Sequence, residues 1–215
     1  LMGKLDALDD AVLHKSVKTI VDQVDAMKRL VNEFRDYARL PSADLKPVQL
    51  NALISDLMVL YANEPADQIP RAPVVTSLDP ACPPILGDEQ QLRQVIHNLL
   101  QNAQDACEIK GLVPQNARVG LRTEWNEARR RVRLTVTDTG PGFEPNILKR
   151  AFEPYVTTKA KGTGLGLAVV KKIADEHAAK IELGNALQDG QIQGAQVSLS
   201  FALDSTMGRA NPPIH

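Results

Sequence analysis

The 215-residue sequence predicts an α+β fold: a two-layer α/β sandwich with a mixed sheet, preceded by one long helix. A heptad of apolar residues over the first 40 positions predicts the long helix. Alternating strand-like and helix-like segments after it predict the sandwich. We therefore divide the chain into a helical part at 1–40, a linker at 41–47, a sandwich domain at 48–204 and a tail at 205–215.

The first helix carries an unbroken a/d pattern, in which apolar residues recur at alternating spacings of four and three. These residues are Leu13, Val17, Ile20, Val24, Met27, Val31, Phe34 and Ala38. Val21 and Leu30 widen the stripe, which favours a helix bundle over a two-stranded coil. Asp9 and Asp10 are the expected start signals, and Pro41 is the stop. One helix cannot bury such a stripe alone, so we expect a partner helix, largely from another chain.

The residues Pro41-Ser-Ala-Asp-Leu-Lys-Pro47 have the composition of a linker. After them, segments with the apolar spacing of a helix alternate with segments that have the pattern of a strand. Apolar residues at helical spacing predict helices over 50–62, 88–109 and 164–178. Short runs with strand character predict strands near 73–78, 84–87, 117–125, 131–138, 180–185 and 194–203.

Composition excludes several classes of protein. The 25 basic and 26 acidic residues leave no basic surplus that would favour nucleic acid or an anionic membrane surface as a partner. No apolar run approaches the roughly 18–20 residues that cross a bilayer, and no signal peptide is expected. Cys82 and Cys107 lack metal-ligand or redox spacing, so we expect two reduced thiols in a cytosolic compartment.

Three glycines at alternate positions, Gly162, Gly164 and Gly166, lead directly into the helix expected at 164–178. Uncovered backbone amides and the helix dipole both favour an anion, so this loop has the character of a phosphate cradle. A flexible turn is the alternative.

Asp138 ends an alternating strand pattern and is followed by Gly140 and Gly142. A carboxylate there can accept a hydrogen bond from an exocyclic amine, while the glycines let a flat ring approach. A hairpin turn capped by the aspartate would explain the same residues.

Asn98 and Asn102 lie four residues apart on an amphipathic helix and so share one face. Asparagine is a poor helix former, but its amide oxygen suits Mg²⁺ held beside nucleotide phosphates. Two solvent-facing amides are the alternative.

Four motifs in a fixed order carry a resemblance to a known family. They are Asn98-Leu-Leu-Gln-Asn102-Ala, Asp138-Thr-Gly-Pro-Gly142, Phe152-Glu-Pro-Tyr155 and Gly162-Thr-Gly-Leu-Gly166-Leu. From Pro47 to Leu203 the chain resembles the ATP-binding domain of bacterial sensor histidine kinases, within the superfamily shared with gyrase-type ATPases. The residues of the third motif and their short distance from the glycines that follow are similar to those of the nitrogen-regulation branch of these kinases.

The resemblance implies ATP and Mg²⁺ as cofactors and assigns roles to individual residues. Asp138 would bind the adenine amine, Asn102 would ligate Mg²⁺, and Asn98 would support it. Lys159 would be catalytic by neutralising charge on the transferred phosphoryl group, with a solvated lysine as the alternative. The implied nucleotide-binding residues are Asn98, Asn102, Asp138, Gly140, Gly142, Thr158, Lys159, Gly162, Thr163, Gly164, Leu165, Gly166 and Leu167. Phe152 and Tyr155 would form a hinge or belong to the core.

The chain departs from the family pattern at Gly194-Ala195, where the family often has Gly-Thr. That difference removes a hydroxyl near the adenine, so this position is left out of the predicted site.

The implied activity is transfer of the γ-phosphoryl group of ATP to a histidine, for relay to an aspartate of a response regulator. An ATP-hydrolysing clamp and a non-catalytic nucleotide sensor are the alternatives. Hydrolytic relatives have a glutamate one turn before the metal-binding asparagine, where this chain has Asn98, so transfer is favoured over hydrolysis.

The phosphoacceptor motif is not found in this sequence, since Lys15 and Ser16 rather than an acidic residue follow His14. We therefore expect the first helix of the phosphotransfer hairpin to lie outside it, and the chain to be unable to label itself. The implied partners are a second copy through the N-terminal helix, in a dimer weakened by half a hairpin, and the receiver domain of a response regulator. The implied location is the cytoplasmic part of a membrane-anchored bacterial sensor, with no direct membrane contact by this portion.

Overall fold

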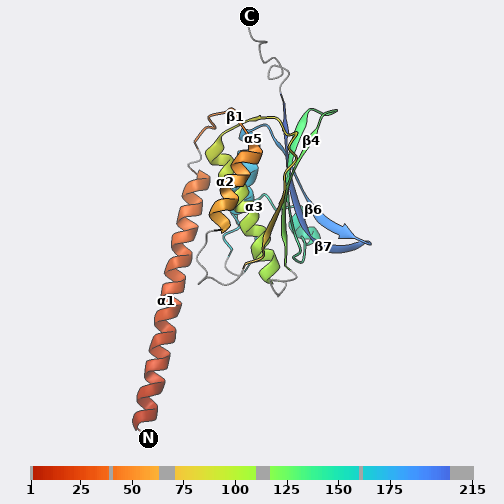
Figure 1. Ribbon diagram of the computed structural model, residues 1–215. Coiled ribbons are helices and arrows are strands. Elements are labelled where there is room, and N and C mark those ends of the chain that lie inside the picture. The colour runs from red at the N-terminus through yellow and green to blue at the C-terminus, as the bar shows by residue number, and fades with distance from the viewer. Residues whose placement is uncertain (1, 39–40, 63–70, 110–116, 160–161, 204–215) are drawn as a thin grey trace, which may run out of the picture.

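A computed structural model describes residues 2–38, 41–62, 71–109, 117–159 and 162–203. Helix α1, Met2–Ala38, stands away from the rest of the molecule (Figure 1). The prediction that it starts at Asp9 or Asp10 is wrong, because Lys4, Leu5 and Ala7 are good helix formers that extend it toward the N-terminus. The large residues of its stripe are solvent-exposed, from 44% for Val24 to 67% for Met27.

The predicted mixed sheet is present, with five strands in the order β2-β4-β5-β7-β6. Their bounds are Val74–Ser77 for β2, Val119–Asn126 for β4, Arg131–Asp138 for β5, Lys180–Gln188 for β6 and Gln191–Ala202 for β7. β2 runs parallel to β4, and the other neighbouring strands are antiparallel. The helices α2 (Leu50–Ala62), α3 (Glu89–Ile109) and α5 (Gly166–Glu176) cover one face, which completes the predicted two-layer sandwich (Figure 1).

Two short elements escape the sequence patterns. β1, Lys46–Val48, pairs antiparallel with β3, Ile85–Gly87, so the expected linker 41–47 ends in a strand. Helix α4, Pro145–Leu148, is a single turn. The lysine and proline of β1 have the composition of a linker, and a single turn such as α4 shows no helical period, so the sequence pattern does not indicate either element. The division of the chain into domains stays a prediction.

The core lies between the sheet and the helices and follows the predicted alternation. Alternate residues of β4 and β5 are buried, while their neighbours are partly exposed on the other face. The inward side chains of these strands and of α3 include Val119, Leu121, Val132, Leu134, Val136, Leu92, Val95, Ile96, Leu99 and Leu100.

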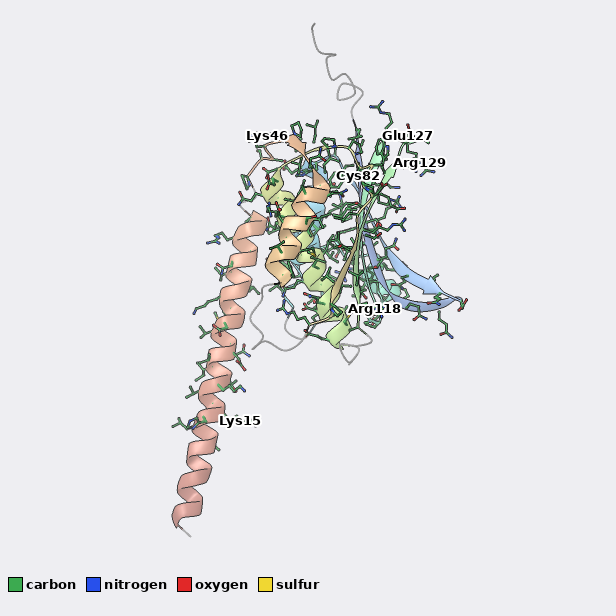
Figure 2. All side chains as sticks on the ribbon, viewed as in Figure 1. Lys15, Lys46, Cys82, Arg118, Glu127 and Arg129 are labelled. Carbon is green, nitrogen blue, oxygen red and sulfur yellow. The ribbon has the colours of Figure 1, made fainter. Side chains whose placement is uncertain are left out.

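The two cysteines are free thiols, as predicted. Cys82 lies near the upper end of the sheet in Figure 2, while Arg118 lies near the lower end. The buried Cys107 thiol lies 3.8 Å from the Arg118 carbonyl oxygen, so the two cysteines are at opposite ends of the sandwich.

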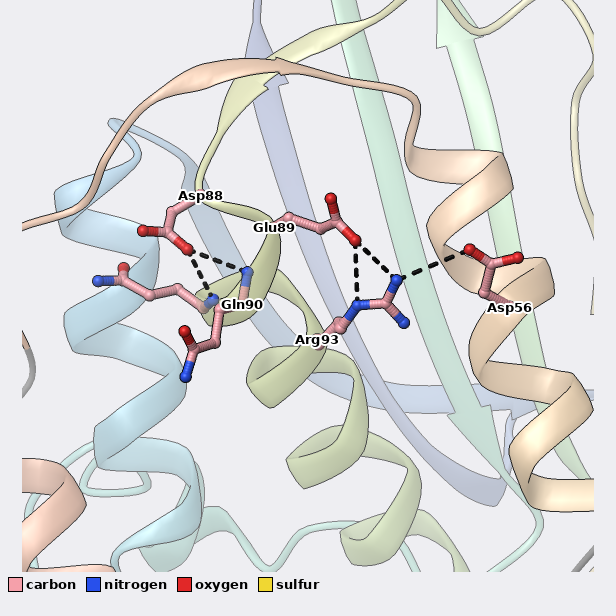
Figure 3. Close-up of polar contacts among 6 residues, drawn as sticks. Asp56, Asp88, Glu89, Gln90 and Arg93 are labelled. Atoms are coloured by element: carbon pink, nitrogen blue, oxygen red, sulfur yellow. Dashed lines mark hydrogen bonds and ion pairs between the residues drawn. The ribbon is translucent and has the colours of Figure 1, made fainter.

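Asp88 joins three elements at the start of α3. Its Oδ1 accepts hydrogen bonds from the backbone amides of Gln90 (3.0 Å) and Gln91 (3.1 Å), as Figure 3 shows, so Asp88 caps the helix. Its Oδ2 accepts one from the Asp44 amide at 3.1 Å. Partial burial opposes ionisation, but these backbone hydrogen bonds outweigh it and hold the pKa of Asp88 below its usual value.

His177, at the C-terminal end of α5, connects that helix to α3. Its Nε2 accepts a hydrogen bond from the Asp88 amide at 2.9 Å, and its Nδ1 lies 2.8 Å from the Ile173 carbonyl oxygen. Because an amide can only donate and a carbonyl can only accept, the hydrogen must be on Nδ1. The residue is 7% exposed, so this histidine is a structural link between the two helices.

We expect His177→Phe to lower the free energy of unfolding by about 1–3 kcal/mol, because the Asp88 amide loses its acceptor in a mostly buried position. The Ile173 carbonyl keeps its hydrogen bond from the backbone amide of residue 177 at 3.1 Å. Urea unfolding measures this loss. His97→Phe is the matched control, since the exposed His97 ring contacts only the Tyr61 hydroxyl among the hydrogen bonds described for it. Equal losses in the two variants would contradict the assignment.

Candidate nucleotide-binding site

Asp138 is the last residue of β5, and its carboxylate is fixed by two backbone amides. Oδ1 accepts hydrogen bonds from Gly140 at 2.8 Å and from Ala195 at 3.1 Å. The β5–β7 ladder ends one pair earlier, at Thr137 and Gln196, so the next amide of β7 binds the aspartate side chain instead. A side chain on Gly194 would overlap the Asp138 carbonyl oxygen, which explains the glycine there.

Position 195, which lies outside the predicted site, contacts the predicted adenine-binding residue Asp138. The contact is made by the backbone N–H of Ala195, which an alanine supplies as well as a threonine does. No short-range sequence pattern could show this contact, because it joins residues 57 positions apart.

The glycines that follow Asp138 let the loop lie close to α3. A Cβ atom on Gly140 would lie 2.8 Å from the Ala106 Cβ, which is too close for any other residue. Gly142 has φ +78°, a backbone conformation that side chains disfavour. Gly140 therefore lies against α3, whereas a Cβ on Gly142 would meet Ile192 and Asn185 of the β6–β7 hairpin. That these glycines let a flat ring approach stays a prediction.

Asn102 and Lys159 come together from α3 and from the loop that precedes α5. The Lys159 ammonium donates to Asn102 Oδ1 at 2.8 Å and to Asp105 Oδ2 at 2.7 Å. All three residues are partly buried. Lys159 is thus not a solvated lysine but part of a charged cluster with the predicted metal ligand.

Asp105 is the acidic member of this cluster, and the sequence analysis does not identify it. It lies three residues after Asn102, on the same face of α3, so this helical spacing could have predicted it as a neighbour of Asn102. Asn98 lies one turn before Asn102 and is half-buried, while Thr158, next to Lys159, is exposed.

The glycine loop opens helix α5 beside Asn102. Gly164 has φ +71°, and its carbonyl oxygen accepts a hydrogen bond from the Tyr155 amide at 3.0 Å. The helix begins at Gly166 with no side-chain hydrogen bond from its N-cap residue, Leu165. A Cβ on Gly166 would lie 3.3 Å from Asn102 Nδ2, so the helix N-terminus and the asparagine are direct neighbours.

Other residues of the predicted loop are arranged around this helix start. Thr163 Oγ1 accepts a hydrogen bond from the Leu165 amide at 3.4 Å, and the Gly162 amide donates to the Lys159 carbonyl at 3.1 Å. Leu165 is fully buried, whereas Leu167 is partly exposed. Residues 160–161 lie outside the described residues. Tyr155 is 58% exposed and so is not a core residue, while Phe152 is half-buried.

The donor atoms near Lys159 fit a hard cation. Asn102 Oδ1 and Asp105 Oδ2 already face one positive group, and both are oxygen donors of the kind that Mg²⁺ uses. Within the described ranges, no group of three or more histidine, cysteine or acidic residues could hold a metal by itself.

The family model described as "Histidine kinase-, DNA gyrase B-, and HSP90-like ATPase" matches residues 87–205, and the chain belongs to this family. The fold and the domain are those of the ATP-binding catalytic part of sensor histidine kinases, which are enzymes.

Two curated relatives come from the nitrogen-regulation branch. Nitrogen regulation protein NtrY of Azorhizobium caulinodans is 32% identical over 202 residues, which cover 93% of this chain and 25% of NtrY. Sensory histidine kinase/phosphatase NtrB of Rhodobacter capsulatus is 33% identical over 180 residues, covering 78% of this chain and 48% of NtrB. The chain spans only about a quarter to a third of the length of its first curated relatives.

Solved structures agree with these relatives. Full-length ShkA in complex with AMPPNP superposes with a TM-score of 0.64 at 29% identity, covering 87% of this chain and 38% of ShkA. ThkA in complex with the response regulator TrrA has a TM-score of 0.63 at 22% identity, over 88% of this chain and 51% of ThkA, and shows the fold alone. Among the described helices of this chain, none is long and apolar enough to cross a membrane.

Proposed function

We propose that this chain binds Mg²⁺ and ATP beside α3 and α5 and transfers the γ-phosphoryl group to a histidine. The observation that carries the proposal is the cluster of Lys159 and Asn102 next to the open N-terminus of α5. A cationic side chain, a metal-ligating oxygen and a helix N-terminus all favour a polyphosphate at the same place.

The adenine end of the pocket is formed by Asp138. Its carboxylate, oriented by the Gly140 and Ala195 amides, accepts a hydrogen bond from the exocyclic amine of the base. Gly140 and Gly142 leave room for the ring. At the other end, the backbone amides of Gly164, Leu165 and Gly166 bind phosphate oxygens.

Asn102 and Lys159 provide the positive charge at the phosphates, one by holding a metal ion and the other by its ammonium group. Asn102 Oδ1 would hold Mg²⁺, which supplies positive charge to the bridged phosphate oxygens when bound. Lys159 leaves Asn102 for the γ-phosphoryl group and stabilises the charge that develops there during transfer. Asn98 supports Asn102 from the preceding turn.

Transfer is favoured over hydrolysis by the side chains on this part of α3. A hydrolytic enzyme needs a group that orients and deprotonates water, and the amide of Asn98 cannot take a proton. Asp105 is a carboxylate, but it is ion-paired with Lys159 at 2.7 Å. A nucleotide sensor without catalysis would not need Lys159 next to Asn102, because no charge develops on a transferred phosphoryl group.

The partners follow from the rest of the molecule. The exposed stripe of α1 supports dimerisation through this helix with a second copy. We further propose a receiver domain as the final phosphoryl acceptor, since the related ThkA is solved in complex with the response regulator TrrA. We also propose that the chain is the cytoplasmic part of a membrane-anchored sensor, as its resemblance to bacterial sensor histidine kinases implies.

A labelling experiment tests the transfer reaction. With radiolabelled ATP and Mg²⁺, we expect no acid-labile label on this chain alone, because no histidine in the sequence is followed by the acidic residue of a phosphoacceptor motif. We expect label on a second polypeptide that carries the phosphotransfer helix of NtrY. Lys159→Met should reduce that label at least about 100-fold, in line with losing one group that stabilises transition-state charge.

The controls separate the outcomes of this experiment. Lys149→Met removes an exposed lysine outside the nucleotide-binding cluster and should leave transfer unchanged. Label on this chain that disappears in His14→Gln would show that His14 is a phosphoacceptor. ATP hydrolysis without any label would favour the hydrolytic clamp instead.

A further inference from the structure

Asn185 on β6 makes a double hydrogen bond to the backbone of Phe143. The Phe143 amide donates to Asn185 Oδ1 at 2.6 Å, and Asn185 Nδ2 donates to the Phe143 carbonyl oxygen at 3.0 Å. A carboxamide offers an acceptor and a donor side by side, so one orientation satisfies both backbone groups. Phe143 directly follows Gly142, and Asn185 therefore holds the end of the glycine loop that begins at Asp138.

The other end of the same loop is held by the neighbouring strand. Asn185 is the registered partner of Ala195 on β7, and the Ala195 amide donates to Asp138 Oδ1. Two paired residues of one hairpin thus bind the two ends of the segment from Asp138 to Phe143. The β6–β7 hairpin therefore holds the loop at both of its ends, where a shift would move the loop relative to the base.

An irregularity in the hairpin directs it toward the loop. The register of β6 and β7 shifts between Ala186 and Leu187, one residue beyond Asn185, and a bulge of this kind bends a strand and redirects side chains. Beyond the shift, Ile192 Cγ2 would lie 2.6 Å from a Cβ on Gly142. The hairpin is therefore packed against the loop as well as hydrogen-bonded to it.

We propose that Asn185 is a positioning residue for adenine, which acts through the loop at Gly140 and Gly142 and not through contact with the nucleotide. This role rests on the proposed ATP site. We expect phosphate binding to be independent of it, because the described side-chain contacts of Asn102 and Lys159 are with each other, with Asp105 and with Gly166, and none of these belongs to the loop or to β6. Loss of Asn185 therefore weakens recognition of the base and spares recognition of the phosphates.

Calorimetry with two ligands tests the role of Asn185. Asn185→Leu removes both hydrogen bonds at similar size, and we expect it to weaken binding of Mg²⁺–ATP about 10-fold, the effect of two ordinary hydrogen bonds. Binding of Mg²⁺–tripolyphosphate, which has no base, should change less than about twofold. Asn185→Ser keeps an acceptor for the Phe143 amide and should recover part of the ATP affinity.

Asn126→Leu is the matched control. Asn126 Oδ1 accepts a hydrogen bond from the Arg129 amide at 2.9 Å in the β4–β5 hairpin, at the end of β5 opposite Asp138. Arg129 lies near the upper end of the sheet in Figure 2. The control variant should bind ATP as the unsubstituted chain does. Unchanged ATP affinity in Asn185→Leu, an equal loss for tripolyphosphate, or an equal loss in Asn126→Leu would overturn the positioning role alone. No ATP binding by the unsubstituted chain would overturn the proposed function with it.

Discussion

Asp138→Asn is expected to weaken ATP binding by about 1.5–3 kcal/mol, roughly 10- to 150-fold, because a charge-assisted hydrogen bond to the adenine amine is lost. The substitution is nearly isosteric, and the remaining carbonyl oxygen can still accept from the Gly140 and Ala195 amides. The loop should therefore keep its conformation while the nitrogen of the new amide faces the amine of the base. Isothermal titration calorimetry with ATP measures the effect.

Asp189→Asn is the control for the change in net charge. Asp189 lies in the exposed turn between β6 and β7 with φ +51°, a conformation that asparagine adopts readily. We expect this variant to bind ATP as tightly as the unsubstituted chain. Unchanged ATP affinity in Asp138→Asn, or equal losses in the two variants, would move the base-binding role to another residue.

The elements that could be predicted from the sequence are those whose pattern is long enough to repeat. β5 was predicted at 131–138 and α2 at 50–62, and the structure gives the same bounds for both. β1 could not be predicted, because its lysine and proline have the composition of a linker, and α4 could not, because a single turn shows no helical period. β1 exists only through its pairing with β3.

The residues of the candidate site also fall into those that the sequence could predict and those that it could not. Asn102, Asp138 and the glycines could be identified because each belongs to a local motif that the sequence displays. The contacts that orient them could not, because they join distant segments: Lys159 reaches Asn102 across 57 positions, and Asn185 reaches Phe143 across 42. A family motif therefore identifies the groups that contact a ligand, but the structure is needed to identify the groups that hold them in place.

Asn102→Ala is expected to abolish the Mg²⁺ dependence of ATP binding. Asn102 Oδ1 is the predicted ligand, and alanine offers no oxygen in its place. In the unsubstituted chain we expect Mg²⁺ to tighten ATP binding at least about tenfold, a contribution of about 1.4 kcal/mol. In the variant, titrations with Mg²⁺ and with EDTA should give dissociation constants within about twofold of each other.

The fold should survive this substitution. The described contacts of the Asn102 side chain are with Lys159 and Gly166, both at the site and not in the core. Alanine also has a higher helix propensity than asparagine by about 0.5 kcal/mol, which favours α3. The midpoint of thermal unfolding without nucleotide should therefore stay the same or rise. A fall of several degrees would mean that the loss of ATP binding reports damage to the fold.

Asn98→Ala separates the two asparagines of α3. It deletes the same amide one turn earlier, and we expect Mg²⁺ to continue to strengthen ATP binding, because Asn98 supports the ligand without binding the ion. In Asn102→Ala, Lys159 keeps its ion pair with Asp105 and loses only its bond to the amide. The lysine alone therefore cannot restore a response to Mg²⁺, since an ammonium repels the ion. A full Mg²⁺ response in Asn102→Ala together with its loss in Asn98→Ala would exchange the roles of the two residues.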